Sequence, residues 1–204
     1  MLENVLTPPT LLERGFNVNN PFGTNPRLGK SKVQSTLASR ESASMLLKTI
    51  NYRGGIIRFQ IPNDWVEEYE DVGGGTFYKP GDDTGTLRVN VMTGEGPPDK
   101  PVTVSGLAEL LTSASTGRGA APIGLGENAV MIRYDMAGEE RGQPLMIRCW
   151  RILQALPPKN FRNVLFTYTV LADRFSSPAS IEDMDLLDRE IAAVQFAPKV
   201  GQLA

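Results

Sequence analysis

The sequence of 204 residues predicts an α+β fold in which an antiparallel β-sheet is flanked by helices and preceded by an extended N-terminal arm. Residues 57–61 and 86–92 alternate apolar and polar side chains, the period-two pattern of strands with one buried face. Residues 129–172 hold three strand patterns in succession, joined by short connections as in an antiparallel meander. A helical pattern follows at residues 178–194, and strands grouped with helices in this way indicate the α+β class.

The strand at residues 57–61 has recognisable ends. A Gly-Gly pair at residues 54–55 provides the backbone freedom for a tight turn before it, and Pro62 ends it because proline has no N–H to donate. The apolar segment 45–51 fits either a helix or a strand, and the turn that follows favours a strand. Trp65 has a large apolar ring, which we expect to be buried.

Two more strands, at residues 76–79 and 86–92, are predicted on either side of the turn residues 80–85. The triple glycine at residues 73–75 invites comparison with a phosphate-binding loop. Such a loop is followed by a helix, usually with Lys and then Ser or Thr. A strand pattern follows here instead, so a hairpin or a bulge is predicted. The acidic residues nearby lack the spacing of a calcium-binding loop and predict a solvated surface.

A short helix is predicted at residues 104–113, with Ser105 as its N-cap. Its apolar face comprises Leu107, Leu110 and Leu111. The Gly-rich residues 115–126 that follow predict a loop of low regularity.

The three strands of the meander are predicted at residues 129–134, 145–156 and 163–172. The polar residues 135–144 are expected to connect the first two. The third is apolar at nearly every position, so we expect it to be central in the sheet and covered on both faces. Cys149 lies in the rhythm of its strand, which predicts a buried thiol.

The last element is the clearest helix of the chain. Ser177 is a cap residue followed by Pro178 at the first helical position. Its apolar stripe comprises Met184, Leu187, Ile191 and Val194. Pro198 is expected to end it.

Composition excludes several classes of function. The chain has no His and a net charge of -2, so Ser-His and Cys-His nucleophile pairs are excluded and nucleic-acid binding is not predicted. A single Cys excludes an internal disulfide and a cysteine-only metal site. No stretch is apolar enough for a signal peptide core or a membrane span. We therefore expect a soluble, cytoplasmic, non-enzymatic protein without a metal or a cofactor.

Residues 1–44 differ from the rest, because they are rich in turn residues and poor in apolar side chains. They predict either a flexible arm without independent structure or an extended arm that lies along a partner. On the second interpretation its anchors are Leu11, Leu12, Phe16 and Phe22, and the partner is another subunit. The predicted domains are the arm, 1–44, and an autonomous sandwich domain, 45–204.

Four arginines occupy the polar positions of apolar strands, namely Arg58, Arg88, Arg133 and Arg148. If their strands share a sheet with matching parity, the four side chains gather on one face. They are then either solvated or salt-bridged surface charges, or a patch that binds an acidic partner segment or an anionic head group.

Three short runs carry a resemblance to a known superfamily. The run YRGGII at residues 52–57, followed by QIP at 60–62, resembles the opening of the Mog-type Ran-binding proteins, and VLFTY at 164–168 resembles the strand before their last helix. In the order of its elements the chain is also similar to PsbP, the extrinsic photosystem subunit, and to DcrB-like bacterial domains. The resemblance covers residues 46–198 and implies an antiparallel sheet sandwiched with helices and a non-enzymatic binding role.

Together these observations predict a protein-interaction module, an accessory or assembly subunit of a larger protein complex; the likeness to PsbP implies an extrinsic subunit. The partner is expected to be another protein, and a membrane protein is not excluded. The alternative is a DcrB-like chaperone or adaptor that binds an apolar segment of a client protein. A concave apolar sheet face would favour the chaperone, and a polar face with arginines the assembly subunit.

Overall fold

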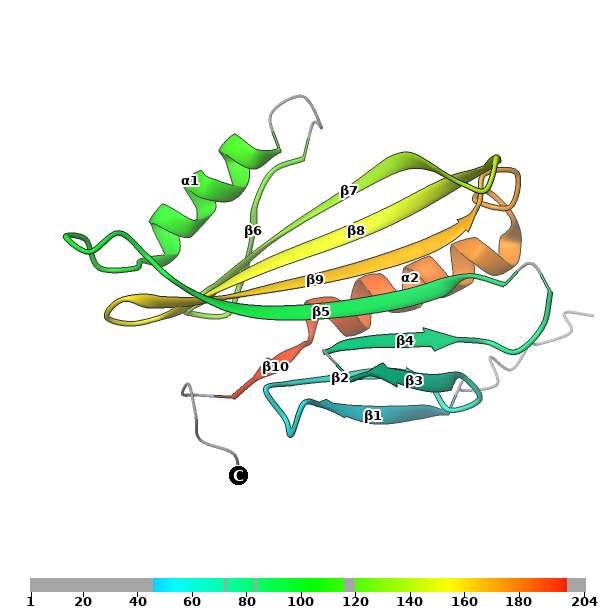
Figure 1. The fold of residues 1–204 in the computed structure, drawn as a ribbon, viewed down its shortest axis with the longest axis horizontal. Helices are drawn as coiled ribbons and strands as arrows, with labels where there is room; N and C mark the ends of the chain where they lie inside the picture. The colour runs from blue at the N-terminus through cyan, green and yellow to red at the C-terminus, as the bar shows by residue number, and fades with distance from the viewer. Residues whose placement is uncertain (1–45, 72, 83, 116–119, 198–204) are drawn as a thin grey trace, which may run out of the picture. The chain divides into compact units, whose positions relative to one another are not determined.

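The computed structural model describes residues 46–71, 73–82, 84–115 and 120–197, which belong to one compact unit, Ala43–Ala204. The predicted arm, with its anchors Leu11, Leu12, Phe16 and Phe22, lies outside the described residues. The described residues form two helices and two β-sheets (Figure 1), which confirms the predicted α+β class. No helix among them is long and apolar enough to cross a membrane.

The smaller sheet contains strands β1 (Leu47–Tyr52), β2 (Ile57–Pro62) and β10 (Gln195–Phe196), in the order β1-β2-β10. The turn at residues 53–55 has positive φ angles of 47°, 71° and 88°, which explains the two glycines there. The segment that fitted a helix or a strand is thus a strand, as the turn predicted, and β2 ends at the predicted proline.

The larger sheet is antiparallel, with the strand order β3-β4-β5-β9-β8-β7-β6. Its strands are β3 (Val66–Glu70), β4 (Gly74–Tyr78), β5 (Thr86–Glu95), β6 (Ile123–Leu125), β7 (Ala129–Glu140), β8 (Gln143–Leu156) and β9 (Asn160–Leu171). The triple glycine leads into β4 rather than into a helix, as predicted. Strand β9 is central, between β5 and β8, also as predicted.

Three of the segments that pair in the larger sheet were not predicted as strands, and one physical reason accounts for them. Strand β3 was not predicted, β6 lies in the expected loop, and residues 135–140 continue β7 where a connection was expected. Each of these segments lies at or near a sheet edge, and most of its side chains are exposed. An exposed edge needs no apolar alternation, so backbone pairing formed there without a sequence pattern. The hairpin between β7 and β8 turns at Arg141 and Gly142, which both have positive φ.

The helices are α1 (Val104–Ala114) and α2 (Pro178–Ala192). The side chain of Thr103, not that of Ser105, caps α1 by accepting a hydrogen bond from the backbone N–H of Gly106. Leu110, placed on the apolar face by the sequence, is 47% exposed. Ser177 caps α2 as predicted.

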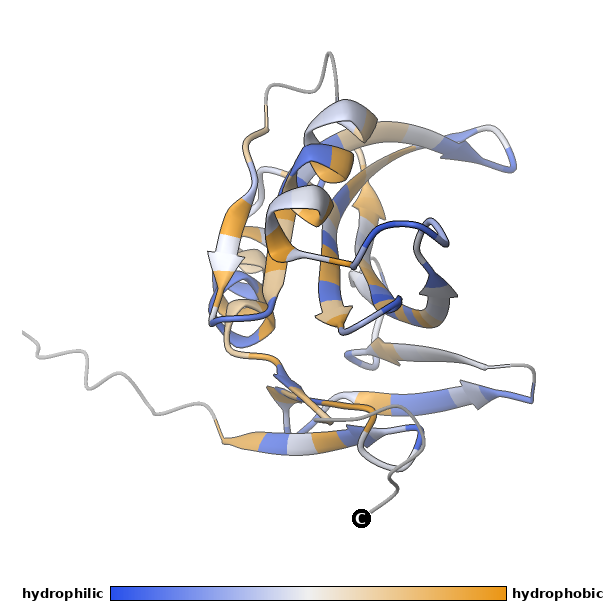
Figure 2. Ribbon diagram, turned by 90° about the vertical axis from the view of Figure 1, so that its left-hand side faces the viewer, coloured by the Kyte–Doolittle hydropathy of each residue, from blue (hydrophilic) through white to orange (hydrophobic). Residues whose placement is uncertain are grey.

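Helix α2 ends at Ala192, earlier than predicted. Val194 lies beyond the helix and joins the core from the segment that leads to β10. Figure 2 shows apolar and polar residues alternating along the strands, with apolar segments on both helices.

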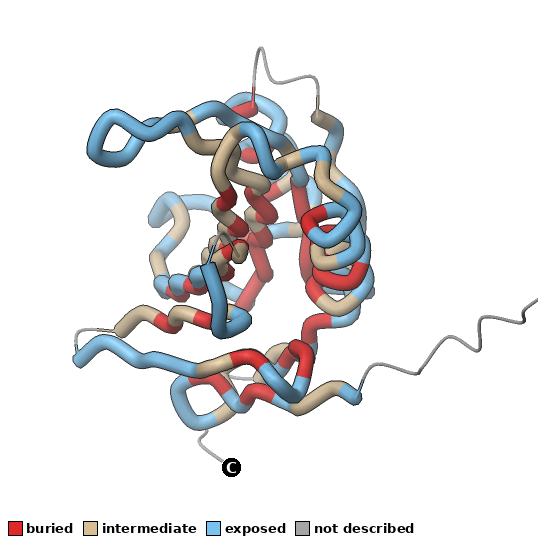
Figure 3. Tube along the Cα trace, turned by 90° about the vertical axis from the view of Figure 1, so that its right-hand side faces the viewer, coloured by how far each residue is buried: buried red, intermediate tan, exposed pale blue. Residues whose placement is uncertain are grey.

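The main core lies between the larger sheet on one side and α2 with the smaller sheet on the other (Figure 3). We call this side of the larger sheet the inner face; it includes Val89, Trp150 and Phe166, which are opposite one another across β5, β8 and β9. A second cluster lies on the outer face, where α1 packs on β7 and β8. Trp65 and Cys149 are both buried, at 3% exposure each, as predicted.

Strand β9 corrects one prediction that matters for function. Its side chains alternate between buried and partly buried, so only its inner face is fully covered by the described residues. The outward positions are partly open because α1 packs mainly on the neighbouring strands β7 and β8. The larger sheet therefore has one closed face and one face that is covered over part of its area.

Buried Arg162 ties the two sheets together. Its Nη1 donates to Gln154 Oε1 at 2.7 Å and to the carbonyl oxygens of Ile56 and Ala197 at 3.3 Å each. These acceptors belong to β8 and to the residues beside β2 and β10. One guanidinium of β9 thus connects the larger sheet to the smaller one. Burial lowers the pKa of Arg162, because the charged form is costly away from water.

Candidate functional site

The structure does not bring the four predicted arginines together. Arg88 is opposite Thr167 on β9, whereas Arg148 is opposite Tyr168. Adjacent residues of a strand point to opposite faces, so Arg88 lies on the outer face and Arg148 on the inner face. Arg133 shares the inner face, and Arg58 lies on the smaller sheet. The matching parity that the prediction required is therefore absent.

Arg133 and Arg148 hold helix α2 on the sheet. Both donate to Asp188 Oδ2 of α2, Arg148 at 3.5 Å. Trp150 Nε1 donates to Asp188 Oδ1 at 2.7 Å, and Arg148 also donates to both carboxylate oxygens of Asp135, at 2.8 and 3.1 Å. The hydrogen bonds to Asp135 raise the pKa of Arg148. These two arginines are thus salt-bridged inside the domain, one of the two alternatives that the sequence left open.

Arg58 lines a polar groove of about 550 Å³ on the smaller sheet, with Glu190 and Gln195 among its neighbours. It makes no ion pair or hydrogen bond with another described residue. Arg58 is thus a solvated charge beside an acidic residue.

The partly covered face of the larger sheet is the most distinctive surface of the domain. We call its uncovered part the open face, meaning the outward side chains of β5, β8 and β9 that are not buried. The open face comprises Thr86, Arg88, Asn90, Met92, Gln143, Leu145, Ile147, Arg151, Phe161, Asn163, Leu165, Thr167, Thr169 and Leu171. Hydroxyl, amide and aliphatic side chains are mixed on it, together with two arginines and no carboxylate.

A pocket of about 150 Å³ sinks into this face at Arg88. Gly74 of β4 lines it, and its position on the outer face carries no side chain that would fill the space. Its polar lining consists of Thr76, Arg88, Asn90 and Thr167, with Glu70 from the edge strand. None of those first four side chains has a hydrogen bond or an ion pair with another described residue. Since no described residue engages them, these polar groups can bind a ligand.

Arg151 is the second arginine of the open face, and it was missed in the sequence. On β8 it is opposite Leu165 of β9, which is in turn opposite Asn90 of β5. Its Nε donates to Asn163 Oδ1 at 3.1 Å. No carboxylate among the described residues pairs with it. Arg151 and buried Cys149 are two residues apart and point to the same side of their strand. The period-two pattern therefore indicated a buried residue at position 151. The available signal was that β8 carries a charge on both parities, at Arg148 and Arg151.

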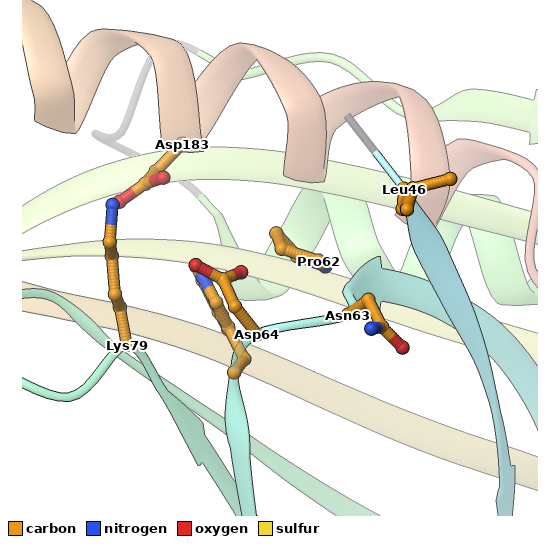
Figure 4. Close-up of a pocket in the computed structure, with 7 residues that line it drawn as sticks. Leu46, Pro62, Asn63, Asp64, Lys79 and Asp183 are labelled. Carbon is orange, nitrogen blue, oxygen red and sulfur yellow. The ribbon is translucent and has the colours of Figure 1, made fainter. Parts of the chain in front are cut away.

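A different cleft lies where β2, β4 and α2 meet. It measures about 370 Å³, and Figure 4 shows the side chain of Lys79 pointing toward Asp183 within it. Tyr168 Oη donates to Asp183 Oδ2 at 2.7 Å, and the ring of Trp65 stacks on Tyr168 with centroids 6.3 Å apart. Burial raises the pKa of Asp183. No group of three His, Cys, Asp or Glu side chains in the described ranges could hold a metal ion.

Tyr168 gives the domain a predicted alkaline sensitivity. Burial, followed by the neighbouring charge of Asp183, raises the pKa of Tyr168 above the ordinary value of 10.0. Above that pH the unfolded chain loses this proton while the native state keeps it, so stability falls as pH rises, by about 1.4 kcal/mol per pH unit. We expect Tyr168→Phe to make this fall shallower by about that amount, measured by urea unfolding at a series of pH values above 10. Equal slopes for the two proteins would contradict the assignment.

Comparisons with known proteins find similarity of fold. No family model matches the chain, and no curated protein matches it. The crystal structure of a Bacteroides thetaiotaomicron protein is similar with a TM-score of 0.51 and 17% identity, over 76% of this chain and 50% of that one. This chain therefore spans about half the length of that protein. LpqN, described as involved in cell envelope biogenesis of Mycobacterium tuberculosis, is similar with a TM-score of 0.49 and 12% identity, over 75% of this chain and 91% of that one.

Two further solved structures give lower TM-scores. A mutant of the protein Mog1 gives a TM-score of 0.43 and 13% identity, over 78% of this chain and 100% of that one. The cyanobacterial PsbP of Synechocystis gives a TM-score of 0.34 and 14% identity, over 77% of this chain and 96% of that one. The predicted architecture, an antiparallel sheet packed with helices, is confirmed by the structure itself.

Proposed function

We propose that this chain is a non-enzymatic protein-interaction module that serves as an accessory or assembly subunit of a larger protein complex. Its binding surface in this proposal is the open face. The observation that carries the proposal is the pair Arg88 and Arg151, two guanidinium groups on an uncovered sheet face with no carboxylate partner among the described residues.

The residues of the inner face and of the open face support the choice of the open face as the binding surface. The inner face is filled by α2 and the smaller sheet, and its arginines are engaged with Asp188. The open face instead combines arginine, aliphatic and hydroxyl side chains, and arginine is enriched at the centres of protein interfaces. Predicted anchors of the arm, Leu11, Leu12, Phe16 and Phe22, belong to the same proposal as contacts to another subunit.

An enzymatic role has less support. Asp183, whose pKa is raised by burial, has the environment of an acid-base residue. Its carboxylate, however, accepts the hydroxyl of Tyr168, which stacks on Trp65 in the core. A packing role accounts for this group. We also propose the cytoplasm as the compartment, since the single cysteine is a buried free thiol.

The test of this proposal is capture of partners from a lysate of the native host. The double variant Arg88→Glu with Arg151→Glu is expected to lose the proteins that the wild type retains, because reversed charges repel what the arginines attract. Quantitative mass spectrometry of the retained proteins is the measurement. Arg58→Glu, a reversal on the other sheet, is the matched control and should retain them. Identical capture by all three proteins, with unchanged circular dichroism, would contradict the open face as the binding surface.

One observation favours the second candidate, a chaperone that holds an apolar segment of a client. Ile147, Leu165 and Leu171 lie on the open face and are only partly buried. If they hold a client, Leu165→Asn should abolish suppression of heat-induced aggregation of an added test protein, while the two arginine reversals leave it unchanged. The opposite pattern of sensitivity supports the assembly subunit.

A further inference from the structure

We infer that the open face binds an extended acidic segment of a partner protein, whose carboxylates pair with Arg88 and Arg151. This inference rests on the proposed function and assigns the chemistry of the partner. It is carried by the charges of the face, by the hydrogen-bond donors around Arg88 that no described residue engages, and by the aliphatic residue between the two arginines.

The two arginines of the open face form no ion pair with a carboxylate of the described residues. The outward side chains of β5, β8 and β9 include Arg88 and Arg151 and no Asp or Glu. The outward acidic side chains on the other strands include Glu140 at the hairpin end of β7 and Glu68 and Glu70 on the edge strand β3, and Glu68 already accepts the hydroxyl of Tyr78 at 2.6 Å. An anionic partner is therefore attracted to the arginines at the centre of the face and repelled from these flanking positions.

The pocket at Arg88 has the groups that a carboxylate requires. A carboxylate has about four acceptor sites, and a guanidinium occupies two of them in a bidentate pair. The hydroxyl groups of Thr76 and Thr167 and the amide of Asn90 line the same pocket and have no bond to another described residue. They can donate to the remaining sites. Glu70 also lines the pocket, and its negative charge opposes an incoming carboxylate, so Arg88 and the three neutral groups must outweigh that repulsion.

The spacing of the two arginines fits an extended chain. Strand β9 separates them, and Arg88 is opposite Thr167 whereas Arg151 is opposite Leu165. Two strand spacings and a two-residue offset place their Cα atoms roughly 12 Å apart. An extended segment spans that distance in about four residues. Leu165 lies between the arginines, so an apolar side chain is favoured between the acidic ones.

The same features disfavour a nucleic acid. A phosphate backbone is bound through many cations along its length, and affinity falls when only two are present. The open face has two arginines with Leu165 between them, and acidic residues at the β3 edge. A peptide with a few carboxylates and apolar side chains matches that pattern better.

A library of random peptides displayed on phage provides a defined probe for the full chain. Peptides selected by the wild type are expected to be enriched in Asp and Glu, with an apolar residue between acidic positions. Arg88→Glu and Arg151→Glu should each weaken the binding of a selected synthetic peptide by roughly tenfold, a loss of about 1.4 kcal/mol. Arg58→Glu should leave the affinity unchanged. Selection on the double reversal should yield basic peptides instead.

Three results would overturn the inference: no selected peptide, selected peptides without acidic enrichment, or acidic peptides whose affinity depends on Arg58 rather than on Arg88 and Arg151. Each differs from failure of the proposed function, which is measured by capture from the host lysate. If capture depends on the open face while selection yields no acidic peptides, the interaction module stands and the acidic partner does not.

Discussion

Replacing Asp188 with alanine is expected to lower the free energy of unfolding by about 2–4 kcal/mol. One carboxylate accepts from Trp150, Arg133 and Arg148, and the ring of Trp150 is fully buried. Without Asp188, the indole N–H has lost its acceptor and two inner-face arginines have lost the charge that they share. Urea or guanidinium unfolding followed by tryptophan fluorescence is the measurement.

Asp188→Asn separates the two contributions. Its amide oxygen can still accept from Trp150 Nε1, while the negative charge is gone. We expect it to lose less stability than Asp188→Ala, because the buried indole N–H keeps its partner. Equal losses would show that the ion pairs dominate. A loss below about 0.5 kcal/mol for the alanine variant, the range of ordinary surface changes, would contradict the role of Asp188 in holding α2 on the sheet.

Replacing Gly85 with alanine is expected to cost about 3 kcal/mol. A Cβ atom on Gly85 would overlap Cζ and Oη of Tyr168. That ring cannot move away cheaply, because it is fully buried, stacks on Trp65 and donates its hydroxyl to Asp183. Thermal and urea unfolding measure the loss. The matched control is Gly124→Ala, whose Cβ would meet nothing within 4 Å, and we expect it to be close to neutral.

A double variant tests the stated cause. Tyr168→Phe removes the hydroxyl that the new methyl group would meet, so Gly85→Ala should cost less in that background than in the wild type. Additive losses would show that the clash is with the ring carbons, which phenylalanine keeps, and not with the hydroxyl.

The regular elements could be predicted because their causes are local. Residues 57–61 alternate because one side of β2 faces the core, and the helix N-cap at Ser177 follows from its own side chain and the proline after it. Composition likewise excluded histidine-based catalysis without reference to a fold. Thr103 competed with Ser105 as a cap within the same few residues, so that boundary was ambiguous from the start.

The candidate site could be predicted only in part. Arg88 was named as a binding residue from its polar position in an apolar strand, and the structure leaves it unpaired among the described residues. Arg133 and Arg148 fit the same pattern, but their partner Asp188 comes from a helix 40 or more residues later. Arg151 did not fit the pattern, because it has the parity of the apolar residues Ile147 and Cys149 in its strand.

The sequence by itself therefore determined which segments are strands with a buried side, where a helix is capped, and which chemistry the chain lacks. The tertiary structure alone decided which face each arginine occupies and which face stays open. Alternation along one strand specifies two sides without saying what covers either. That depends on the register between strands distant in the sequence, such as Arg88 opposite Thr167, and on α1 packing on β7 and β8 rather than on β5 and β9.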